Sequence, residues 1–185
     1  MSGHSSCTLP STVRRATLED APVLAAIAEQ TFRESFEDVN EPADLNLHCT
    51  THFGADIQRA EITDANVIAL LGLSEQGIPV GYAQVRLQSP SPWIESAQVT
   101  ELHRIYVQRD YIGTGIAHPL ISAVLDLAQT HGASHTWLGV WENNPRAIAF
   151  YRKYGFDVVG EQVFTLGTDP QRDLVMARAM DTPQP

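Results

Sequence analysis

Hydrophobic positions follow two different periods along this chain, and each period predicts one kind of element. Short apolar or alternating runs, bounded by Gly, Pro and polar residues, predict strands at 13–17, 66–73, 80–88, 99–107, 135–140, 156–166 and 174–179. Apolar residues three and four positions apart predict helices at about 17–35, 41–61, 115–131 and 145–154. Gly132 and Gly155 directly follow two of these segments, where glycine commonly ends a helix.

The order of these elements, β-α-α-β-β-β-α-β-α-β-β, describes an α/β (α+β) fold in which a mixed sheet carries helices on both faces. The chain has 185 residues, a length that suits one domain with a sizeable core. Residues 1–12 and 181–185 are rich in Ser, Thr, Pro or Gln, so we expect flexible tails on either side of a single domain at 13–180.

The charge of the chain narrows the classes of partner. It carries 22 acidic and 12 basic residues, which gives a formal net charge of −10. Affinity for nucleic acid comes mainly from clustered Lys and Arg, so this balance argues against a nucleic-acid partner. The negative field is compatible with a cationic substrate, although solubility alone is the simpler explanation of such a charge.

Cysteine usage and hydropathy indicate the compartment. Cys7 and Cys49 do not form a disulfide framework, and free thiols are typical of a reducing environment. The first dozen residues contain neither a basic region nor an apolar stretch, and no apolar run approaches the length of a membrane span. We therefore expect a cytoplasmic protein without a membrane partner. The His residues are scattered and no CxxC pair occurs, so no metal site is expected.

Two segments in the second half of the chain resemble the motifs of a known family. ELHRIYVQRDYIGTGIAHPLI at 101–121 resembles the acetyl-CoA-binding motif of the GCN5-related N-acetyltransferases, the GNAT family, and WENNPRAIAFYRKYGF at 141–156 is similar to that family's second motif. Either segment alone is weak evidence for the family, whereas both segments in the right order are specific to it. TFRESF (31–36), LGVWENN (138–144) and GEQVFTLGTDPQRDLVM (160–176) resemble the branch related to spermidine and spermine acetyltransferases of the PaiA type.

The resemblance covers about residues 13–180 and implies both a fold and an activity. The GNAT fold is a mostly antiparallel sheet of about seven strands, with a splay between two central parallel strands, here 99–107 and 135–140. The implied activity is transfer of acetyl from acetyl-CoA to a small cationic amine, such as the polyamine spermidine, by a monomer or homodimer. The alternatives are an acetyltransferase for a protein or peptide N-terminus or an antibiotic-like amine, and a catalytically silent CoA-binding regulatory module.

A Gly-rich turn between a strand and a helix is suited to the pyrophosphate of the cofactor. Such a turn exposes unpaired backbone N–H groups to an anion, with the helix dipole behind them, although an ordinary strand-to-helix connection has the same short Gly-x-Gly pattern. The turn consists of Gly113, Thr114, Gly115, Ile116, Ala117 and His118. Two departures from the family pattern, Ile112 in place of Gln or Arg and Pro119 near the first helical turn, are expected to weaken cofactor binding modestly.

The resemblance also implies where the pantetheine arm binds. The arm would lie in the gap between the splayed strands and pair with the backbone of Ile105, Tyr106 and Val107. The N–H of Val107 would point at the thioester oxygen. Asn144, favoured slightly over Asn143, would bond the pantetheine together with the neighbouring Ala147, whereas the plain role of such an Asn is to cap the helix that follows.

The chemistry requires a base for the amine and a proton donor for the thiolate that leaves. An alkylammonium with a pKa of about 10.4 is almost fully protonated at pH 7. Glu101 is the best candidate base, acting directly or through water, and His103 lies on the same strand face and is a second candidate. A solvent-exposed carboxylate and a structural histidine are the plain alternatives.

Tyr151 matches the Tyr of the family's Phe-Tyr pair, and the resemblance makes it the proton donor, which a phenol of pKa about 10 can be at neutral pH. We expect Phe32, Phe36 and Tyr82 to wall the acceptor site together with Glu101 and His103, although these aromatic residues suit a core equally well. Two further residues, Trp93 and Glu95, lie in a Pro-rich loop that would cover this site.

Overall fold

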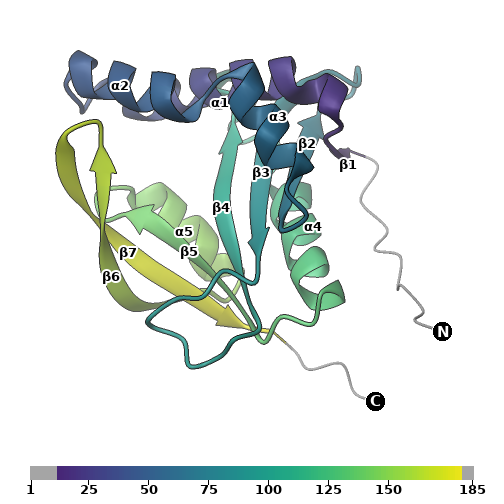
Figure 1. The fold of residues 1–185 in the computed structure, drawn as a ribbon, viewed down its shortest axis with the longest axis vertical. Helices are drawn as coiled ribbons and strands as arrows, with labels where there is room; N and C mark the ends of the chain where they lie inside the picture. The colour runs from purple at the N-terminus through teal and green to yellow at the C-terminus, as the bar shows by residue number, and fades with distance from the viewer. Residues whose placement is uncertain (1–11, 181–185) are drawn as a thin grey trace.

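A computed structural model of the chain describes residues 12–180 (Figure 1), so the expected tails lie outside the described residues apart from Thr12. The strands are β1 (Val13–Arg15), β2 (Val67–Leu73), β3 (Pro79–Leu87), β4 (Val99–Val107), β5 (His135–Trp141), β6 (Asp157–Leu166) and β7 (Asp169–Ala179). The helices are α1 (Ala21–Phe36), α2 (Pro42–His52), α3 (Ala55–Thr63), α4 (Ala117–Thr130) and α5 (Pro145–Lys153), with 3-10 turns at Leu18–Asp20 and Arg109–Tyr111.

The strands form one open sheet of seven strands in the order β1-β2-β3-β4-β5-β7-β6. The central neighbours β4 and β5 run parallel, and the other neighbouring pairs run antiparallel. This arrangement confirms the predicted fold class.

Successive residues of the sheet bury against different helices. Leu70 of β2 and its partner Ala83 of β3 pack with residues of α4 and α5. The next pair, Leu71 and Tyr82, packs with residues of α1 and α2. Because side chains alternate across a strand, the sheet has a side that carries α4 and α5, called here the α4 side, and a side that carries α1 and α2, called the α1 side.

The two central strands separate after a short contact. Within residues 12–180, β4 pairs with β5 only at Val99–Glu101, opposite His135–Trp137, whereas β4 stays paired with β3 up to Val107. Figure 1 shows the two strands diverging, with α5 behind the gap. The edge of β4 beyond Glu101 therefore faces the gap, and its backbone groups are available to a ligand there.

A bulge in β4 changes which side chains face the gap. Gln84 pairs with Arg104 and Val85 pairs with Leu102, so His103 is an extra residue without a partner in register. A bulge interrupts the alternation of side chains. His103 and Arg104 are adjacent in sequence, yet both form polar contacts: His103 bonds with Glu101, and Arg104 bonds with Glu61.

The helix predicted from residue 17 begins at Ala21, after a 3-10 turn at Leu18–Asp20, and two further elements differ from the sequence-based expectation. The helical region at 41–61 is two helices, because Phe53 and Gly54 take extended conformations between α2 and α3. Strand β7 begins at Asp169 and not at Leu174, because the polar segment that starts it pairs with the end of β6.

Cys49 is a free and buried thiol on α2, and burial raises its pKa. Cys7 lies outside the described residues. Among residues 12–180, no helix has both the length and the apolar character that crossing a bilayer demands.

Candidate active site

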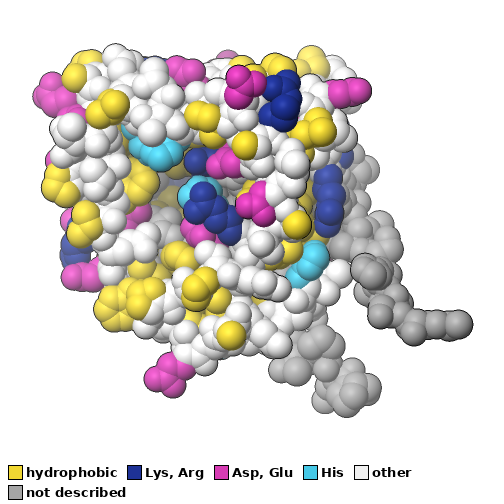
Figure 2. All heavy atoms as spheres, in the orientation of Figure 1, with side chains coloured by type: hydrophobic (Ala, Val, Ile, Leu, Met, Phe, Trp, Pro, Cys, Tyr) yellow, Lys and Arg dark blue, Asp and Glu magenta, His cyan; other side chains and the backbone are white. Residues whose placement is uncertain are grey.

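A cavity of about 620 Å³ opens at the gap between β4 and β5. Figure 2 shows one face of the molecule hollowed near its centre, where histidine, basic and acidic side chains meet. Most of the expected site residues line this cavity: Phe32, Phe36, Glu101, His103, Ile105, Tyr106, Val107, Ile112, Gly113, Gly115, Ala117, His118, Asn144, Ala147 and Tyr151. The splay of the sheet therefore brings both sequence motifs to one place.

The turn before α4 leaves backbone donors free. Gly113 and Gly115 have φ angles of 85° and 98°, and a side chain at either position would point into open space. Within residues 12–180, the N–H groups of Gly113, Gly115 and Ile116 donate to no backbone acceptor, whereas Thr114 donates to Tyr111. Three free amides at the start of a helix of 14 residues form a cradle that fits an anion such as a pyrophosphate.

Two residues of this turn have a structural role and do not line the cavity. The hydroxyl of Thr114 donates to the carbonyl of Tyr111 at 2.7 Å, which closes the turn. The side chain of Ile116 packs over Gly72 of β2. Only the backbone of these two residues is therefore available to a ligand.

Helix α5 presents a second set of side chains to the cavity. Asn144 caps the helix, because its side-chain oxygen accepts a hydrogen bond from the N–H of Ala147 at 3.1 Å. The side-chain NH₂ of Asn144 stays free within residues 12–180, so capping leaves it able to bind a ligand. Arg146 and Lys153, which were not among the expected site residues, also line the cavity. Their spacing of two helical turns was the available signal.

Tyr151 lies on α5 at the inner wall of the cavity and is only 8% exposed. Burial, with a smaller contribution from Tyr106, raises its pKa above the ordinary value of 10. Burial likewise raises the pKa of Tyr106 to about 12. Tyr151 therefore keeps its proton at neutral pH and lies in the same cavity as the free amides before α4.

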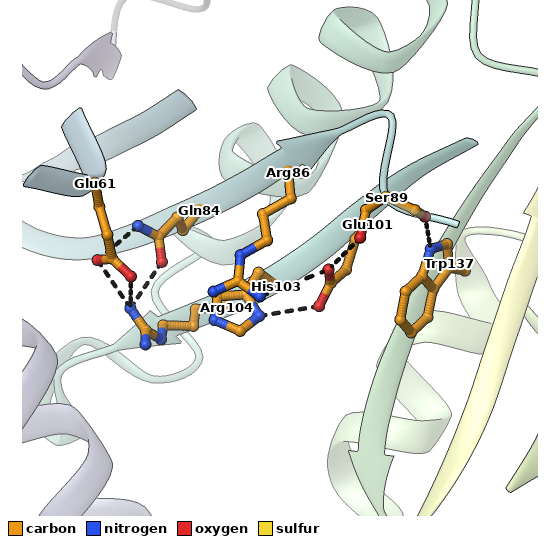
Figure 3. A network of polar contacts seen from close by, with 8 residues as sticks. All are labelled: Glu61, Gln84, Arg86, Ser89, Glu101, His103, Arg104 and Trp137. Carbon is orange, nitrogen blue, oxygen red and sulfur yellow. Dashed lines mark hydrogen bonds and ion pairs between the residues drawn. The ribbon is translucent and has the colours of Figure 1, made fainter. Parts of the chain in front are cut away.

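A chain of hydrogen bonds fixes Glu101 and His103 (Figure 3). The indole N–H of Trp137 donates to the carbonyl of Ser89 at 2.8 Å, and the Ser89 hydroxyl donates to Oε2 of Glu101 at 2.7 Å. The other carboxylate oxygen, Oε1, lies 2.9 Å from Nδ1 of His103. Arg86 approaches Oε2 at 3.9 Å. Both carboxylate oxygens are thus engaged.

The electrostatics of this pair favour a neutral imidazole. Burial, which the hydrogen bond to Glu101 only partly offsets, lowers the pKa of His103 below 6.5. Burial would raise the pKa of Glu101, but its bonds with His103 and Ser89 lower it below 4.5 overall. An ionised carboxylate only accepts hydrogen bonds, so Nδ1 carries the proton and Nε2 holds the lone pair. Nε2 is buried and has no hydrogen-bond partner within residues 12–180.

Arg104 is a second charged group in the cavity wall, and it is neutralised locally. Its guanidinium lies 3.2 Å from both carboxylate oxygens of Glu61 and donates to Gln84 at 2.7 Å (Figure 3). Gln84 in turn donates to Glu61 at 2.9 Å. The guanidinium carbon of Arg104 also lies over the ring of Phe53, 5.3 Å from its centroid. This network spans α3, β3 and β4 and adds little net charge to the cavity.

Aromatic rings form the wall on the α1 side. Phe36 contacts the rings of Phe32, Tyr106 and Trp141, with centroids 4.7, 6.4 and 6.2 Å away. Tyr82 does not belong to this wall, contrary to the expectation, because it is fully buried in the core behind Tyr106.

The Pro-rich loop does not cover the cavity with the expected residues. Trp93 packs against Gly160 of β6, and neither Trp93 nor Glu95 lines the cavity. The contribution of this loop is Ser89, which holds Glu101. Elsewhere, His48 and His52 of α2 bring their rings within 4.4 Å, but no third potential metal ligand joins them within residues 12–180.

Three polar residues of β6 and β7 that were not among the expected site residues also line the cavity: Gln162, Gln171 and Asp173. Asp173 is 8% exposed, and burial raises its pKa to about 6. The strand predicted from the sequence begins at Leu174 and so leaves Asp173 out. In the observed strand, which begins at Asp169, Asp173 alternates onto the same face as the buried Val175 and Ala177. A buried position of this kind is unusual for a carboxylate.

A comparison with known families agrees with this geometry. The model of the family described as "Acetyltransferase (GNAT) family" matches residues 25–156, well over half of the chain. The chain belongs to this family. As a GNAT protein it is an acetyl-CoA-dependent N-acetyltransferase, which confirms the predicted enzyme class and cofactor.

Individual relatives cover most of the chain. An uncharacterized N-acetyltransferase of Mycobacterium tuberculosis is 34% identical over 88% of this chain and 99% of its own length. A probable spermine N(1)-acetyltransferase of Bacillus subtilis is 26% identical over 69% of this chain and 88% of its own length. The PaiA N-acetyltransferase of Thermoplasma acidophilum, solved with coenzyme A, has the same fold, with a TM-score of 0.74, 16% identity and coverage of 90% and 97%.

Proposed function

We propose that this GNAT enzyme acetylates a small cationic amine, and that a polyamine such as spermidine is the preferred acceptor. The observation that carries the proposal is the distribution of charge around the cavity. The basic Arg146 and Lys153 line it on α5, whereas the carboxylates of Glu101 and Asp173 line it on β4 and β7. Arg104 is neutralised by Glu61. The resemblance to the PaiA-type branch and the similarity to a probable spermine acetyltransferase support the same acceptor class.

The cavity has groups that fit acetyl-CoA. The free amides of Gly113, Gly115 and Ile116 would hold the pyrophosphate, and the basic side chains of α5 would add charge where Ile112 supplies none. The open edge of β4 would pair with the two amides of the pantetheine, as an added strand does. When bound there, acetyl-CoA supplies an acetyl group already activated as a thioester.

His103 fits the role of base better than Glu101. Its Nε2 atom has a lone pair and lacks a hydrogen-bond partner within the described residues, so an amine N–H would satisfy it. Glu101 holds the opposite ring nitrogen and stabilises the charge that the imidazole gains with a proton. Tyr151 would hold its proton for the leaving sulfur, since burial keeps the phenol neutral. Glu101 is in this assignment a positioning residue.

An assay of thiol release tests the proposed function. The purified chain and acetyl-CoA are incubated with spermidine, spermine, single amino acids and short peptides in parallel. We expect release with the polyamines and little with amino acids. Release with peptides alone would instead indicate acetylation of a protein N-terminus, and silence with every acceptor, despite measurable CoA binding, would indicate a regulatory module.

A further inference from the structure

The carboxylate of Asp173 occupies an unusual position in the cavity wall. Strand β7 pairs Asp173 with Trp141 on one side and with Gln162 on the other. The carboxylate leans over β5, where Oδ2 lies 3.2 Å from the point that a Cβ on Gly139 would occupy. The amide of Gln162 lies even closer to that point, at 2.6 Å. The missing side chain of Gly139 thus makes room for two polar groups beside the gap.

The carboxylate of Asp173 is buried without a charge partner among residues 12–180. Asp173 is more than nine-tenths buried, yet it forms no ion pair within residues 12–180, and burial is the only cause of its raised pKa. Its register partners on β5 and β6, Trp141 and Gln162, are neutral, and so is the phenol of Tyr106 on β4, whose pKa is raised by burial and further by the charge of Asp173. Burying an unpaired charge is unfavourable, so a cation that binds in the cavity would relieve this cost.

We propose that Asp173 binds an ammonium group of the acceptor that does not itself react, so that the site selects amines with a second positive charge. A carboxylate stabilises the protonated form of a nearby amine. Asp173 therefore suits the nitrogen that stays protonated. It does not suit the reacting nitrogen, which must lose a proton. The base His103 lies on β4, whereas Asp173 lies on β7, beyond β5. The proposal requires that a diamine reach across the gap, with the reacting nitrogen at His103 and the other at Asp173. This assignment rests on the proposed function and names its acceptor more closely.

The test compares two acceptors of equal length, 1,4-diaminobutane and butylamine, at pH 8 and saturating acetyl-CoA. We expect the wild-type enzyme to prefer the diamine by at least about tenfold in kcat/KM. Asp173→Asn should raise KM for the diamine by about 10- to 100-fold, the range of a hydrogen-bonded charge pair, and should change kcat/KM for butylamine less than about threefold. Asp157→Asn, which removes an exposed carboxylate at the start of β6, is the matched control and should leave the preference intact.

Binding of the diamine to the CoA-bound protein, measured by calorimetry, separates two kinds of failure. Binding that depends on Asp173 without any acetylation would overturn the proposed function and support the ammonium site. Acetylation of the diamine with an unchanged preference in Asp173→Asn would overturn the ammonium site alone. A fall in kcat of equal size for both amines would also overturn it, because Asp173 would then act on the reacting nitrogen.

Discussion

The hydroxyl of Tyr151 is the group whose removal distinguishes catalysis from binding most sharply. Phenylalanine keeps the ring and its packing and deletes one buried oxygen. We predict that Tyr151→Phe lowers kcat by about 10²-fold, the size typical of a lost proton donor, and changes the dissociation constant of CoA less than about threefold. Steady-state kinetics and calorimetric titration with CoA measure the two quantities. Equal losses in both would count against the role of proton donor.

The pH dependence of kcat identifies the base. The active form of His103 is neutral, and its pKa is lowered, so the group charges only as the pH falls below 6.5. We predict that kcat, measured at saturating substrates, is constant above pH 6.5 and declines at some lower pH. His103→Gln should lower the plateau by about 10²-fold and remove this decline.

The same profile separates the two candidates. The pKa of Glu101 is lowered from an ordinary value of 4.5, so a base at Glu101 would keep kcat constant down to below that pH. A decline that begins only below pH 4.5 in the wild-type enzyme would show that the Glu101 carboxylate accepts the proton. Glu101→Gln should in either case impair the enzyme, since it removes the acceptor for Nδ1 of His103.

The turn before α4 owes its free amides to two glycines in left-handed conformations. At a φ of 98°, an alanine in place of Gly115 is strained and shifts the backbone of the cradle. We predict that Gly115→Ala weakens CoA binding by at least about tenfold. Gly132→Ala is the matched control, because Gly132 has a φ of 71° after the last turn of α4 and does not line the cavity. It should lower the melting temperature to a similar extent and leave CoA affinity unchanged, and a similar affinity loss in both variants would refute the cradle.

The elements themselves were largely predictable, because each has a strong local signal. Strand β4 was predicted with its observed ends at Val99 and Val107, since it alternates and is bounded by polar and Pro-containing segments. The predicted helix at 115–131 corresponds to α4 at Ala117–Thr130 for the same reason. A strand segment that forms only by pairing with another strand is harder to predict from the sequence. The polar start of β7 carries no hydrophobic pattern and becomes a strand only because β6 lies beside it.

The candidate site was accessible only where a motif or a local pattern marks it. The glycines at 113 and 115 and Tyr151 lie within the two family motifs. Nothing in the sequence shows that His103 is the extra residue of a bulge, because a bulge is defined by the register of β4 against β3. The sequence does not mark Asp173 either, because its burial also depends on pairing with another strand. The segment around it has the composition of a loop, and its neighbour Arg172 forms exposed ion pairs.

The charge of the whole molecule acts on the acceptor before it reaches the cavity. With a net charge of −10, the protein attracts a polyamine more strongly than a monoamine, since the attraction grows with the charge of the ligand. Dissolved salt weakens this attraction, because the screening length falls from about 30 Å at 0.01 M to about 8 Å at 0.15 M. An encounter rate that depends on such a field must therefore depend on ionic strength.

We predict that kcat/KM for spermidine falls several-fold between about 0.01 M and 0.15 M NaCl at saturating acetyl-CoA, and that the value for butylamine falls clearly less. The monoamine controls for effects of salt on the enzyme and on cofactor binding, because both acceptors react in the same cavity with the same bound cofactor. A long-range field acts on diffusion and changes kcat little, so the loss should appear in kcat/KM alone. If both amines lose activity in parallel, the negative charge serves solubility, and selection of the acceptor depends only on the groups inside the cavity.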